Sequence, residues 1–340
     1  MSGTLGRAAG ATDTGRRRRH NEDAYVCEPP LFAIADGMGG ARAGEVASSL
    51  AAAVLGDIGE ERGEARVAEL IAEANRRVFE RSSEDEETSG MGTTMTVALV
   101  DGATIAFGHV GDSRAYRVRA GAIEQLTDDH SLVGELVRSG RLSPEEAEVH
   151  PQRSVITRAL GTEPDVDVDT FTVEAQQGDL YLLCSDGLTD MLSDDEILEL
   201  LDGAGDPEAA TGRLVEAANA HGGDDNITVV VFEIAAEGAA SLEETVRMPA
   251  AQDEPPPATA DDEDTLSGLE GVPVVDTAVI PAAEVQRHLE EEPAAAPPRA
   301  ARAERRSPRR EPARRSVLPF LVLLLVLAGV TLLVLWGLFR

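Results

Sequence analysis

Residues 94–119 read TMTVALVDGATIAFGHVGDSRAYRVR, and this stretch decides the class of fold. It holds three runs rich in apolar and β-branched residues, at 94–100, 104–110 and 115–119, and short turns with Gly and Asp separate them. Strand runs that follow one another without helices between them favour antiparallel sheets over a doubly wound parallel sheet. The stretch therefore indicates antiparallel sheets.

The rest of residues 1–236 extends this pattern to an α+β domain. Further strand patterns lie at 31–36, 179–186 and 226–234. Apolar residues at helical spacing predict helices at 43–55, 65–81, 131–139, 194–201 and 207–220. Because the strands gather in adjacent runs and do not alternate strictly with helices, we expect antiparallel sheets covered by helices, and not a doubly wound parallel sheet.

The composition changes after residue 236. Residues 237–316 are rich in Pro, Ala and blocks of like charge, and they contain almost no aromatic residues. Such a segment cannot bury enough apolar surface to offset the entropy of the chain. We therefore expect residues 237–316 to form a disordered linker, acidic at first and then rich in Arg and Pro.

Residues 317–339, VLPFLVLLLVLAGVTLLVLWGLF, form a run of 23 residues without a charge. A helix of this length covers a hydrocarbon core of about 30 Å, so the run predicts a single transmembrane helix. Eight arginines lie between residues 299 and 315, and only Arg340 follows the run. The positive-inside tendency then places residues 1–236 in the cytoplasm, at the inner membrane. The N-terminal residues have no apolar core and are not a secretory signal peptide.

Net charge and cysteine content exclude two classes of protein. The formal net charge of −32 argues against a nucleic-acid-binding protein, which needs a basic face to meet phosphates. The two cysteines, Cys27 and Cys184, have no spacing typical of a zinc site or of a disulfide framework. Both thiols suit a reducing cytoplasm.

Aspartates stand at the ends of several predicted strands, usually beside a glycine. Asp36 closes the strand at 31–36, Asp112 follows the strand at 104–110, and Asp186 closes the strand at 179–186. Asp225 precedes the last strand, and Asn21-Glu22-Asp23 lie near the start of the chain. Any single Asp-Gly pair is ordinary turn chemistry. Several carboxylates at the ends of adjacent strands, however, converge in space and repel unless cations or protons neutralise them.

Oxygen ligands without Cys and with little His select hard cations, so we expect magnesium or manganese. Two such ions about 4 Å apart clamp a phosphoryl group and generate hydroxide for in-line attack. Glycine beside Asp36 also lets a backbone carbonyl approach as a ligand. From the residues alone, the sequence predicts a two-metal hydrolase that acts on a phosphate ester.

Seven segments resemble, in order and spacing, the motifs of the type-2C metal-dependent protein phosphatases. They are RRHNEDAY, ADGMGG followed by GEVAS, GMGTTMTVAL, HVGDSRAY, HPQRSVITRALG, LCSDGLTD and GGDDNITVVV, and their order and spacing match the family from about residue 3 to residue 234. The resemblance implies a four-layer α-β-β-α sandwich of two antiparallel sheets with helices outside. It also implies hydrolysis of phosphoserine and phosphothreonine in proteins by direct attack of metal-activated water, in opposition to a cognate serine/threonine kinase.

The resemblance also assigns roles to residues of this chain. Asp36 would bridge two metal ions, Gly37 would ligate through its carbonyl, and Asp186 and Asp225 would complete the second ion's ligands. Asp112 with Asp186 would form a third metal site, as in bacterial members. Glu22 and Asp23 would act through metal-bound waters, and Arg18 would hold the substrate phosphate. The catalytic set is therefore Arg18, Asp36 and Asp186.

Two positions leave alternatives open. Arg16, Arg17, Arg18 and Arg19 are consecutive; spacing favours Arg18 for the phosphate, and the other interpretation of the run is a nucleic-acid or membrane patch. Some relatives carry a histidine after the bridging Asp-Gly that can protonate the leaving alkoxide, but this chain has Met38, as many bacterial members do. His109 and His130 are candidate acids by residue type only, and a metal-bound water is the leading expectation.

Residues 129–160 correspond in the family to a mobile flap beside the active site; a helical hairpin with a solvated face is the alternative. Two other functions also remain open. One is a phosphatase dedicated to a single small regulatory protein, and the other is an inactive, membrane-held module that binds phosphoproteins. The intact set Asp36, Asp112, Asp186 and Asp225 argues against the inactive module.

Overall fold

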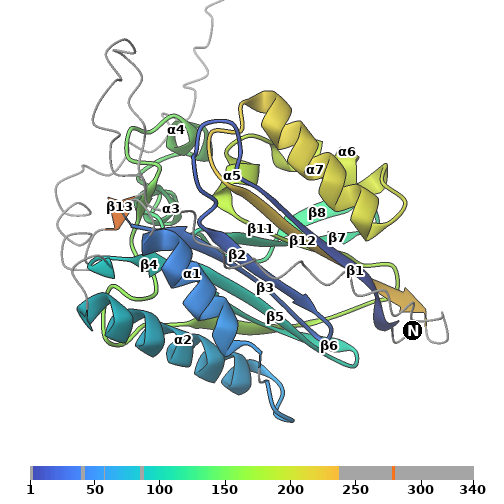
Figure 1. Ribbon diagram of the computed structural model, residues 1–340. Coiled ribbons are helices and arrows are strands. Elements are labelled where there is room, and N and C mark those ends of the chain that lie inside the picture. Colours follow the sequence, from blue (N-terminus) through green and yellow to red (C-terminus); the bar gives the residue numbers. More distant parts are fainter. Residues whose placement is uncertain (1–2, 40–42, 57, 85–87, 237–277, 280–340) are drawn as a thin grey trace, which may run out of the picture. The chain divides into compact units, whose positions relative to one another are not determined.

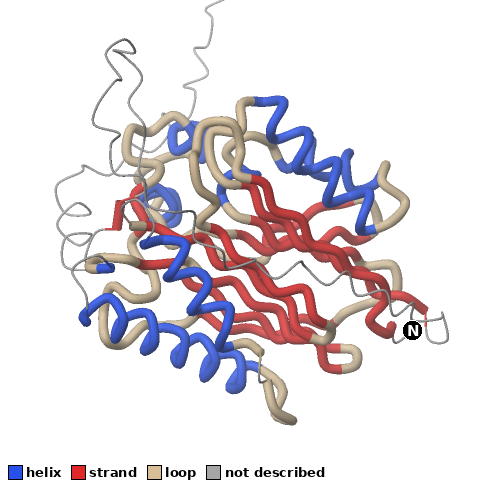
Figure 2. The backbone as a smooth tube through the Cα atoms, in the orientation of Figure 1, coloured by secondary structure: helices blue, strands red, loops and turns tan. Residues whose placement is uncertain are grey.

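Two antiparallel sheets pack face to face, and helices cover their outer faces in the computed structural model (Figure 1). The structure describes residues 3–39, 43–56, 58–84, 88–236 and 278–279. In Figure 2 the strands of the two sheets lie between a pair of helices on one side and further helices on the other. The α+β fold with two antiparallel sheets flanked by helices is thus confirmed.

The first sheet has the strand order β10-β6-β5-β3-β2, and β4 pairs separately with β3. Its strands are β2 (Asp23–Glu28), β3 (Leu31–Met38), β4 (Gly92–Thr93), β5 (Met95–Asp101), β6 (Thr104–Val110) and β10 (Asp169–Glu174). The helices α1 (Ala43–Val54) and α2 (Glu64–Glu84) cover its outer face.

The second sheet has the strand order β1-β12-β11-β7-β8. Its strands are β1 (Gly3–Asp13), β7 (Arg114–Arg119), β8 (Ala122–Gln125), β11 (Leu180–Cys184) and β12 (Ile227–Ala236). The helices packed against it are α5 (Asp186–Thr189), α6 (Asp194–Asp202) and α7 (Pro207–His221). Ser193 caps α6 with a full capping box and Asp206 caps α7 ahead of Pro207, so the sequence itself fixes where these helices start.

A third group of short elements lies between β8 and β10. It contains α3 (Leu132–Arg138), α4 (Pro144–Glu148) and β9 (Val155–Ile156), and β13 (Ala278–Val279) pairs with β9. This group occupies the segment expected to be a flap or a helical hairpin, and two short helices are present in it. Residues 278–279 belong to the stretch predicted as a linker, and the rest of that stretch lies outside the described residues.

The core explains why β3 reads as a continuous apolar run. Alternate residues of β3 face opposite ways: Leu31 and Ala33 pack under α1 and α2, whereas Phe32 and Ile34 pack between the sheets. The layer between the sheets is aromatic, and Phe32 stacks on Phe232 of β12 with ring centroids 4.2 Å apart. A strand buried on both faces needs apolar side chains at every position, and β3 has them from Leu31 to Ala35.

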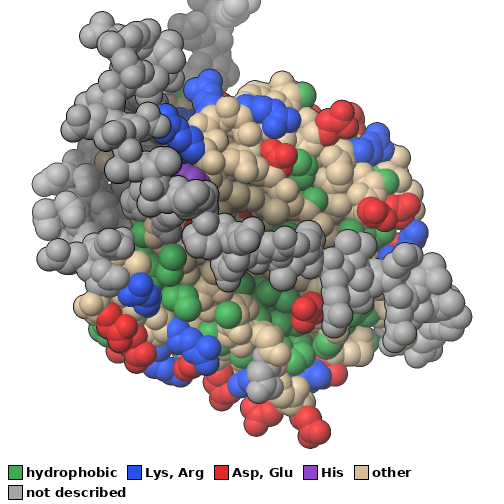
Figure 3. All heavy atoms as spheres, viewed as in Figure 1, with side chains coloured by type: hydrophobic (Ala, Val, Ile, Leu, Met, Phe, Trp, Pro, Cys, Tyr) green, Lys and Arg blue, Asp and Glu red, His purple; other side chains and the backbone are tan. Residues whose placement is uncertain are grey.

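The surface over α2 carries mixed charge. Basic and acidic side chains are interspersed along this edge of the molecule (Figure 3), and Glu73 pairs with both Arg76 and Arg77. Pairs at these helical spacings stabilise an exposed helix face modestly. Such a face is therefore a solvated surface and not a basic patch.

The predicted transmembrane helix at 317–339 is not among the described residues. Within the ranges that are described, no helix is both long and apolar enough to cross a membrane.

Candidate metal centre

The fold brings the predicted carboxylates to one end of the two sheets. Asp36 lies near the end of β3, and Asp23, at the start of β2, is its register partner. From the second sheet, Asp186 begins α5 two residues after the end of β11, and Asp225 lies two residues before β12. Asp112 lies in the connection from β6 to β7, which joins the two sheets. Strand ends from both sheets therefore supply this cluster.

The carboxylates of the cluster affect one another electrostatically. Burial raises the pKa of Asp36 well above its usual value, and the charges of Asp23, Asp186, Asp225 and Asp112 raise it further. Burial also raises the pKa of Asp186, with Asp112 and Asp225 as the next causes. Each carboxylate is thus harder to ionise because the others are present.

The outer members of the cluster show the same effect. Burial raises the pKa of Asp112 to about 7, with a further contribution from Asp129. Burial raises the pKa of Glu22 to about 7, although the Arg18 charge opposes the rise. Asp23 has a pKa of about 6 because burial outweighs its hydrogen bonds from Thr228 and Ser185. The region as a whole has an excess of buried negative charge that a cation would relieve.

Three of these carboxylates carry oxygens that nothing in the described structure satisfies. The Oδ1 atoms of Asp23, Asp112 and Asp186 are buried and have no hydrogen-bond partner among the described residues. Buried polar atoms without partners are rare and costly, so they indicate a missing partner. A set of carboxylate oxygens is the donor chemistry that Mg²⁺ and Mn²⁺ prefer. The residues present fit these ions, because they offer carboxylate oxygens and three of those oxygens have no hydrogen-bond partner among the described residues.

The arrangement is nevertheless open. In the described part of the chain, no three Asp, Glu, His or Cys side chains are grouped closely enough to enclose a metal ion. Mutual repulsion of unneutralised carboxylates favours such an open arrangement. The fit to a metal therefore rests on the orphaned oxygens and the shared pKa shifts, and not on a closed set of ligands.

Gly37, the predicted carbonyl ligand, lies in a very close backbone contact. A Cβ at this position would lie 2.1 Å from the Gly44 carbonyl oxygen and 2.5 Å from that of Glu22. The Gly37 amide also donates to the Glu22 carbonyl at 3.1 Å. Only glycine permits the ends of β2, β3 and the start of α1 to meet here. Gly44, the first residue of the GEVAS segment, makes the reciprocal contact with the Gly37 carbonyl.

Arg18 lies beside Asp225, a member of the cluster. Its Nη2 is 2.7 Å from Asp225 Oδ2. Arg17 instead pairs with Asp224, and the Arg17 side chain is 59% exposed against 26% for Arg18. Of these two arginines, only Arg18 directs its guanidinium at a carboxylate of the centre.

Sequence reasoning missed the residues that hold the carboxylates in place. Asn226 is 5% exposed, and its Oδ1 accepts from the Glu22 amide while its Nδ2 donates to the carbonyls of Thr14 and His20. Ser185 and Thr228 both donate hydroxyl hydrogen bonds to Asp23 Oδ2. The available signal was position, because Asn226 directly follows Asp225 and Ser185 directly precedes Asp186.

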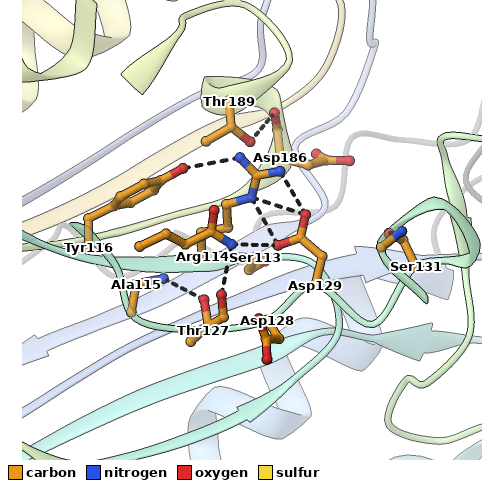
Figure 4. A network of polar contacts seen from close by, with 12 residues as sticks. Ser113, Arg114, Ala115, Tyr116, Thr127, Asp128, Asp129, Ser131, Asp186 and Thr189 are labelled. Atoms are coloured by element: carbon orange, nitrogen blue, oxygen red, sulfur yellow. Dashed lines mark hydrogen bonds and ion pairs between the residues drawn. The ribbon is translucent and has the colours of Figure 1, made fainter. Parts of the chain in front are cut away.

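A second polar network supports the connection that carries Asp112 (Figure 4). Arg114 binds Asp129 through Nε at 2.9 Å and Nη2 at 2.7 Å, and its Nη1 donates to the Tyr116 hydroxyl. Gln125 adds a hydrogen bond to Asp129. A bidentate Arg–carboxylate pair fixes both partners in direction as well as distance. The network therefore anchors the start of β7 to the segment before α3.

Neither candidate histidine is placed as a free acid. His109 is 1% exposed, with Nδ1 at 2.9 Å from Thr96 Oγ1 and Nε2 at 3.2 Å from the Asp128 carbonyl, and burial lowers its pKa to about 3. His130 Nδ1 accepts from the Gly111 amide, and its Nε2 lies 3.2 Å from Asp169 Oδ2. Both rings serve the structure. Met38 is buried against Ile156 and Ala159.

The fold and this acidic centre define a metal-dependent phosphatase of the kind that the motifs suggest. The family model described as protein phosphatase 2C matches residues 15–217, and the chain belongs to this family.

Known relatives agree with this assignment. The chain is 42% identical over 235 residues to the serine/threonine phosphatase stp of Listeria monocytogenes serotype 4b, covering 65% of this chain and 93% of that protein. It is 44% identical over 234 residues to the serine/threonine protein phosphatase PstP of Mycobacterium tuberculosis, covering 67% of this chain and 45% of that protein.

Two solved structures share the fold. The crystal structure of the Mycobacterium tuberculosis phosphatase PstP/Ppp matches with a TM-score of 0.66 and 41% identity, covering 68% of this chain and all of that one. The catalytic domain of PstP in complex with two manganese ions matches with a TM-score of 0.63 and 40% identity, covering 68% of this chain and 99% of that one.

The excess buried charge predicts how metal-free stability depends on pH. Since the folded-state pKa of Asp112 is raised to about 7, its ionisation destabilises the fold progressively as pH rises from about 4 to about 7. We expect Asp112→Asn, in buffer with chelator at pH 8, to raise the free energy of unfolding by up to about 4 kcal/mol. The gain should vanish near pH 4, as measured by urea denaturation.

The control for charge alone is Asp165→Asn, which removes an exposed carboxylate. It should change stability by less than about 0.5 kcal/mol at either pH. A metal-free Asp112→Asn protein that is less stable than the unsubstituted chain at pH 8 would contradict the picture of mutual repulsion.

Proposed function

We propose that this chain is a metal-dependent protein phosphatase that hydrolyses phosphoserine and phosphothreonine in proteins at the acidic centre. The cofactor is manganese or magnesium. The observation that carries the proposal is the set of buried, unpartnered oxygens on Asp23, Asp112 and Asp186, with the Arg18 guanidinium at the rim. When bound, the metal ions supply an activated water as nucleophile and neutralise charge on the phosphoryl group.

The residues proposed to hold these ions follow from their places in the cluster. We assign Asp36, the Gly37 carbonyl, Asp186 and Asp225 to the two principal ions. Asp112 and Asp186 support a third position, because the charge of Asp112 is, after burial, the largest cause of the raised pKa of Asp186. Glu22 and Asp23 flank the principal pair, where Asn226, Ser185 and Thr228 fix them.

Arg18 is proposed to bind the substrate phosphate. Its ion pair with Asp225 holds the guanidinium beside the centre before substrate arrives, so little side-chain entropy is lost on binding. A guanidinium presents two parallel N–H groups to two phosphate oxygens. Arg18 therefore orients the phosphorus toward the carboxylate cluster.

The leaving group receives no proton from the position after the Asp-Gly pair. Met38 has no proton to donate, and it is buried against β9. His109 and His130 are both engaged in the structure, as described above. The proton for the serine or threonine alkoxide is therefore proposed to come from water at the centre.

The first test removes one central carboxylate. Asp186→Asn should retain the fold. Its rate of manganese-dependent hydrolysis of p-nitrophenyl phosphate and of a phosphothreonine peptide should fall by at least about 100-fold, because a charged carboxylate ligand is lost. The matched control is Asp195→Asn, an exposed aspartate on α6. Near-normal turnover by Asp186→Asn would refute the assignment, and an unsubstituted chain that binds but does not hydrolyse phosphopeptides would favour a binding module.

The second test compares neighbouring arginines. Arg18→Ala should lower kcat/KM for phosphopeptide by about 10- to 100-fold, the value expected for loss of charge-assisted hydrogen bonds to phosphate. Arg17→Ala, whose arginine pairs with Asp224 on the surface, should change it by less than about twofold. Arg18→Lys should recover only part of the loss. Equal effects at the two positions would show that the run acts as a diffuse basic patch.

We also propose that residues 317–339 anchor the phosphatase to the inner membrane with its catalytic domain in the cytoplasm. The 23 uncharged residues and the eight arginines before them support this topology. A cognate serine/threonine kinase would act on the same phosphoproteins. When cells are fractionated, the full chain should sediment with the membranes, whereas deletion of 317–339 should release the phosphatase activity to the soluble fraction. In intact cells, protease added outside should leave the catalytic domain uncut. Cleavage by that protease would show that the orientation is the opposite one.

A further inference from the structure

A short strand from beyond the catalytic domain pairs with the segment between β8 and β10. β13 (Ala278–Val279) forms a parallel ladder with β9 (Val155–Ile156), with Ala278 opposite Val155 and Val279 opposite Ile156. Figure 1 shows β13 in orange. The 41 residues 237–277 separate it from β12 along the chain. The pairing is therefore a long-range contact made by the chain with itself.

One edge of β9 is already used inside the catalytic domain. The Thr157 amide donates to the His130 carbonyl at 2.8 Å, and Ser131 forms a bridge with Ile156. Hydrogen-bonding groups of successive residues in a strand point to opposite edges, so the backbone groups of Ile156 face away from His130. That opposite edge is the one on which β13 lies. An open edge of this kind is a template for any extended chain.

β9 packs against the strand that carries Asp36. Ile156 is 1% exposed and contacts Met38, which lies two residues after Asp36. On its inner edge, β9 bonds His130, whose amide donates to the Gly111 carbonyl beside Asp112. β9 is therefore connected through Met38 to the strand that carries Asp36, and through His130 to the connection that carries Asp112.

We propose that the open edge of β9 is a docking site for extended peptide chain, and that residues 278–279 occupy it in cis and compete there with protein substrates. The proposal rests on the proposed function and adds a regulation of the same site. A phosphoprotein presents its phosphoresidue in an extended segment, and pairing with β9 would position that segment beside the centre. A small phosphate ester needs no such edge.

The sequence and the tether both favour the chain's own segment as occupant. Residues 272–281, VPVVDTAVIP, are rich in β-branched residues and interrupt a stretch dominated by acidic residues, Ala and Pro. A connection of 41 residues is long enough to reach β9 without strain, and loop-closure entropy grows only slowly with length. Tethering of this kind gives an effective concentration on the order of millimolar. A ladder of two residues is weak in itself, so occupancy is reversible and can be displaced.

Disulfide trapping in the full chain tests the docking. Directly paired strands lie about 4.8 Å apart, within the Cα range of a disulfide. In a Cys27→Ser background, the pair Val155→Cys and Ala278→Cys should cross-link at least about tenfold faster than the pair Val155→Cys and Ala260→Cys, which shares the tether but not the register. Equal rates for the two pairs would overturn the proposal.

Kinetics in the full chain test the competition. Val279→Pro removes a backbone N–H and is poorly accommodated in a ladder, whereas Ala260→Pro places the same residue in the linker outside the strand. Val279→Pro should lower KM for a phosphothreonine peptide by about threefold or more, because a millimolar intramolecular competitor is released. Hydrolysis of p-nitrophenyl phosphate should stay unchanged. A synthetic peptide of residues 272–283 added to Val279→Pro should raise KM again.

The two readouts separate the possible failures. Cross-linking together with unchanged peptide KM in Val279→Pro overturns the competition, and so does an equal change for both substrates. A chain that hydrolyses neither substrate with manganese refutes the proposed function and the competition with it. The relative cross-linking rates decide the docking in every case, because they require no catalysis.

Discussion

Electrostatic repulsion among buried carboxylates is the constraint on which the structure depends. In addition to the effect of burial, Asp112 and Asp186 raise the pKa of Asp36, and Asp112 raises the pKa of Asp186. A cluster of this kind opposes folding in the absence of a counter-charge, and the rest of the domain has to stabilise the fold against it. The aromatic layer between the sheets does so at a distance, since Phe232 stacks on both Phe32 and Tyr181. Close to the cluster, Asn226, Ser185 and Thr228 fix positions without neutralising charge. Neutral hydrogen bonds therefore fix the geometry of the centre, and metal ions are needed to neutralise its charge.

An element of the fold could be predicted from the sequence where its signal is local, and not where it depends on contacts between residues far apart in the chain. Strands with alternating or continuous apolar patterns, such as β3, β5 and β12, were predicted because their signal is local. β1 was not predicted, since GTLGRAAGATD contains three glycines and few β-branched residues, and it is held mainly by its long register with β12. The class of site followed from carboxylates at strand ends. The family resemblance added the particular roles.

The supporting residues of the site could not be predicted for a physical reason. Asn226 bonds Glu22 and the carbonyls of Thr14 and His20, which precede it by more than 200 residues. Such contacts exist only after both sheets have formed, and an Asn after an Asp reads locally as a turn. The choice of Arg18 among four arginines was different. It depended on which residue faces the centre, and the structure places Arg18 against Asp225 and Arg17 against Asp224. β13 was not predicted, because its short β-branched run at 272–281 lies inside a Pro- and Ala-rich stretch that is typical of a linker.

Met38 connects the chemistry of the centre to the edge of β9. At the corresponding position some relatives use a histidine that can protonate the leaving group, and a histidine there must keep access to solvent and substrate. In this chain the residue is 7% exposed and packs on Ile156 and Ala159, so it fixes β9 to the strand that carries Asp36. One side chain cannot both lie in an apolar contact and exchange protons. Methionine at this position donates no proton to the leaving group. It does connect the carboxylates rigidly to β9, where we propose that an incoming chain docks. Since Met38 cannot act as an acid, selectivity for substrates then depends more on docking at β9 than on protonation of the leaving group.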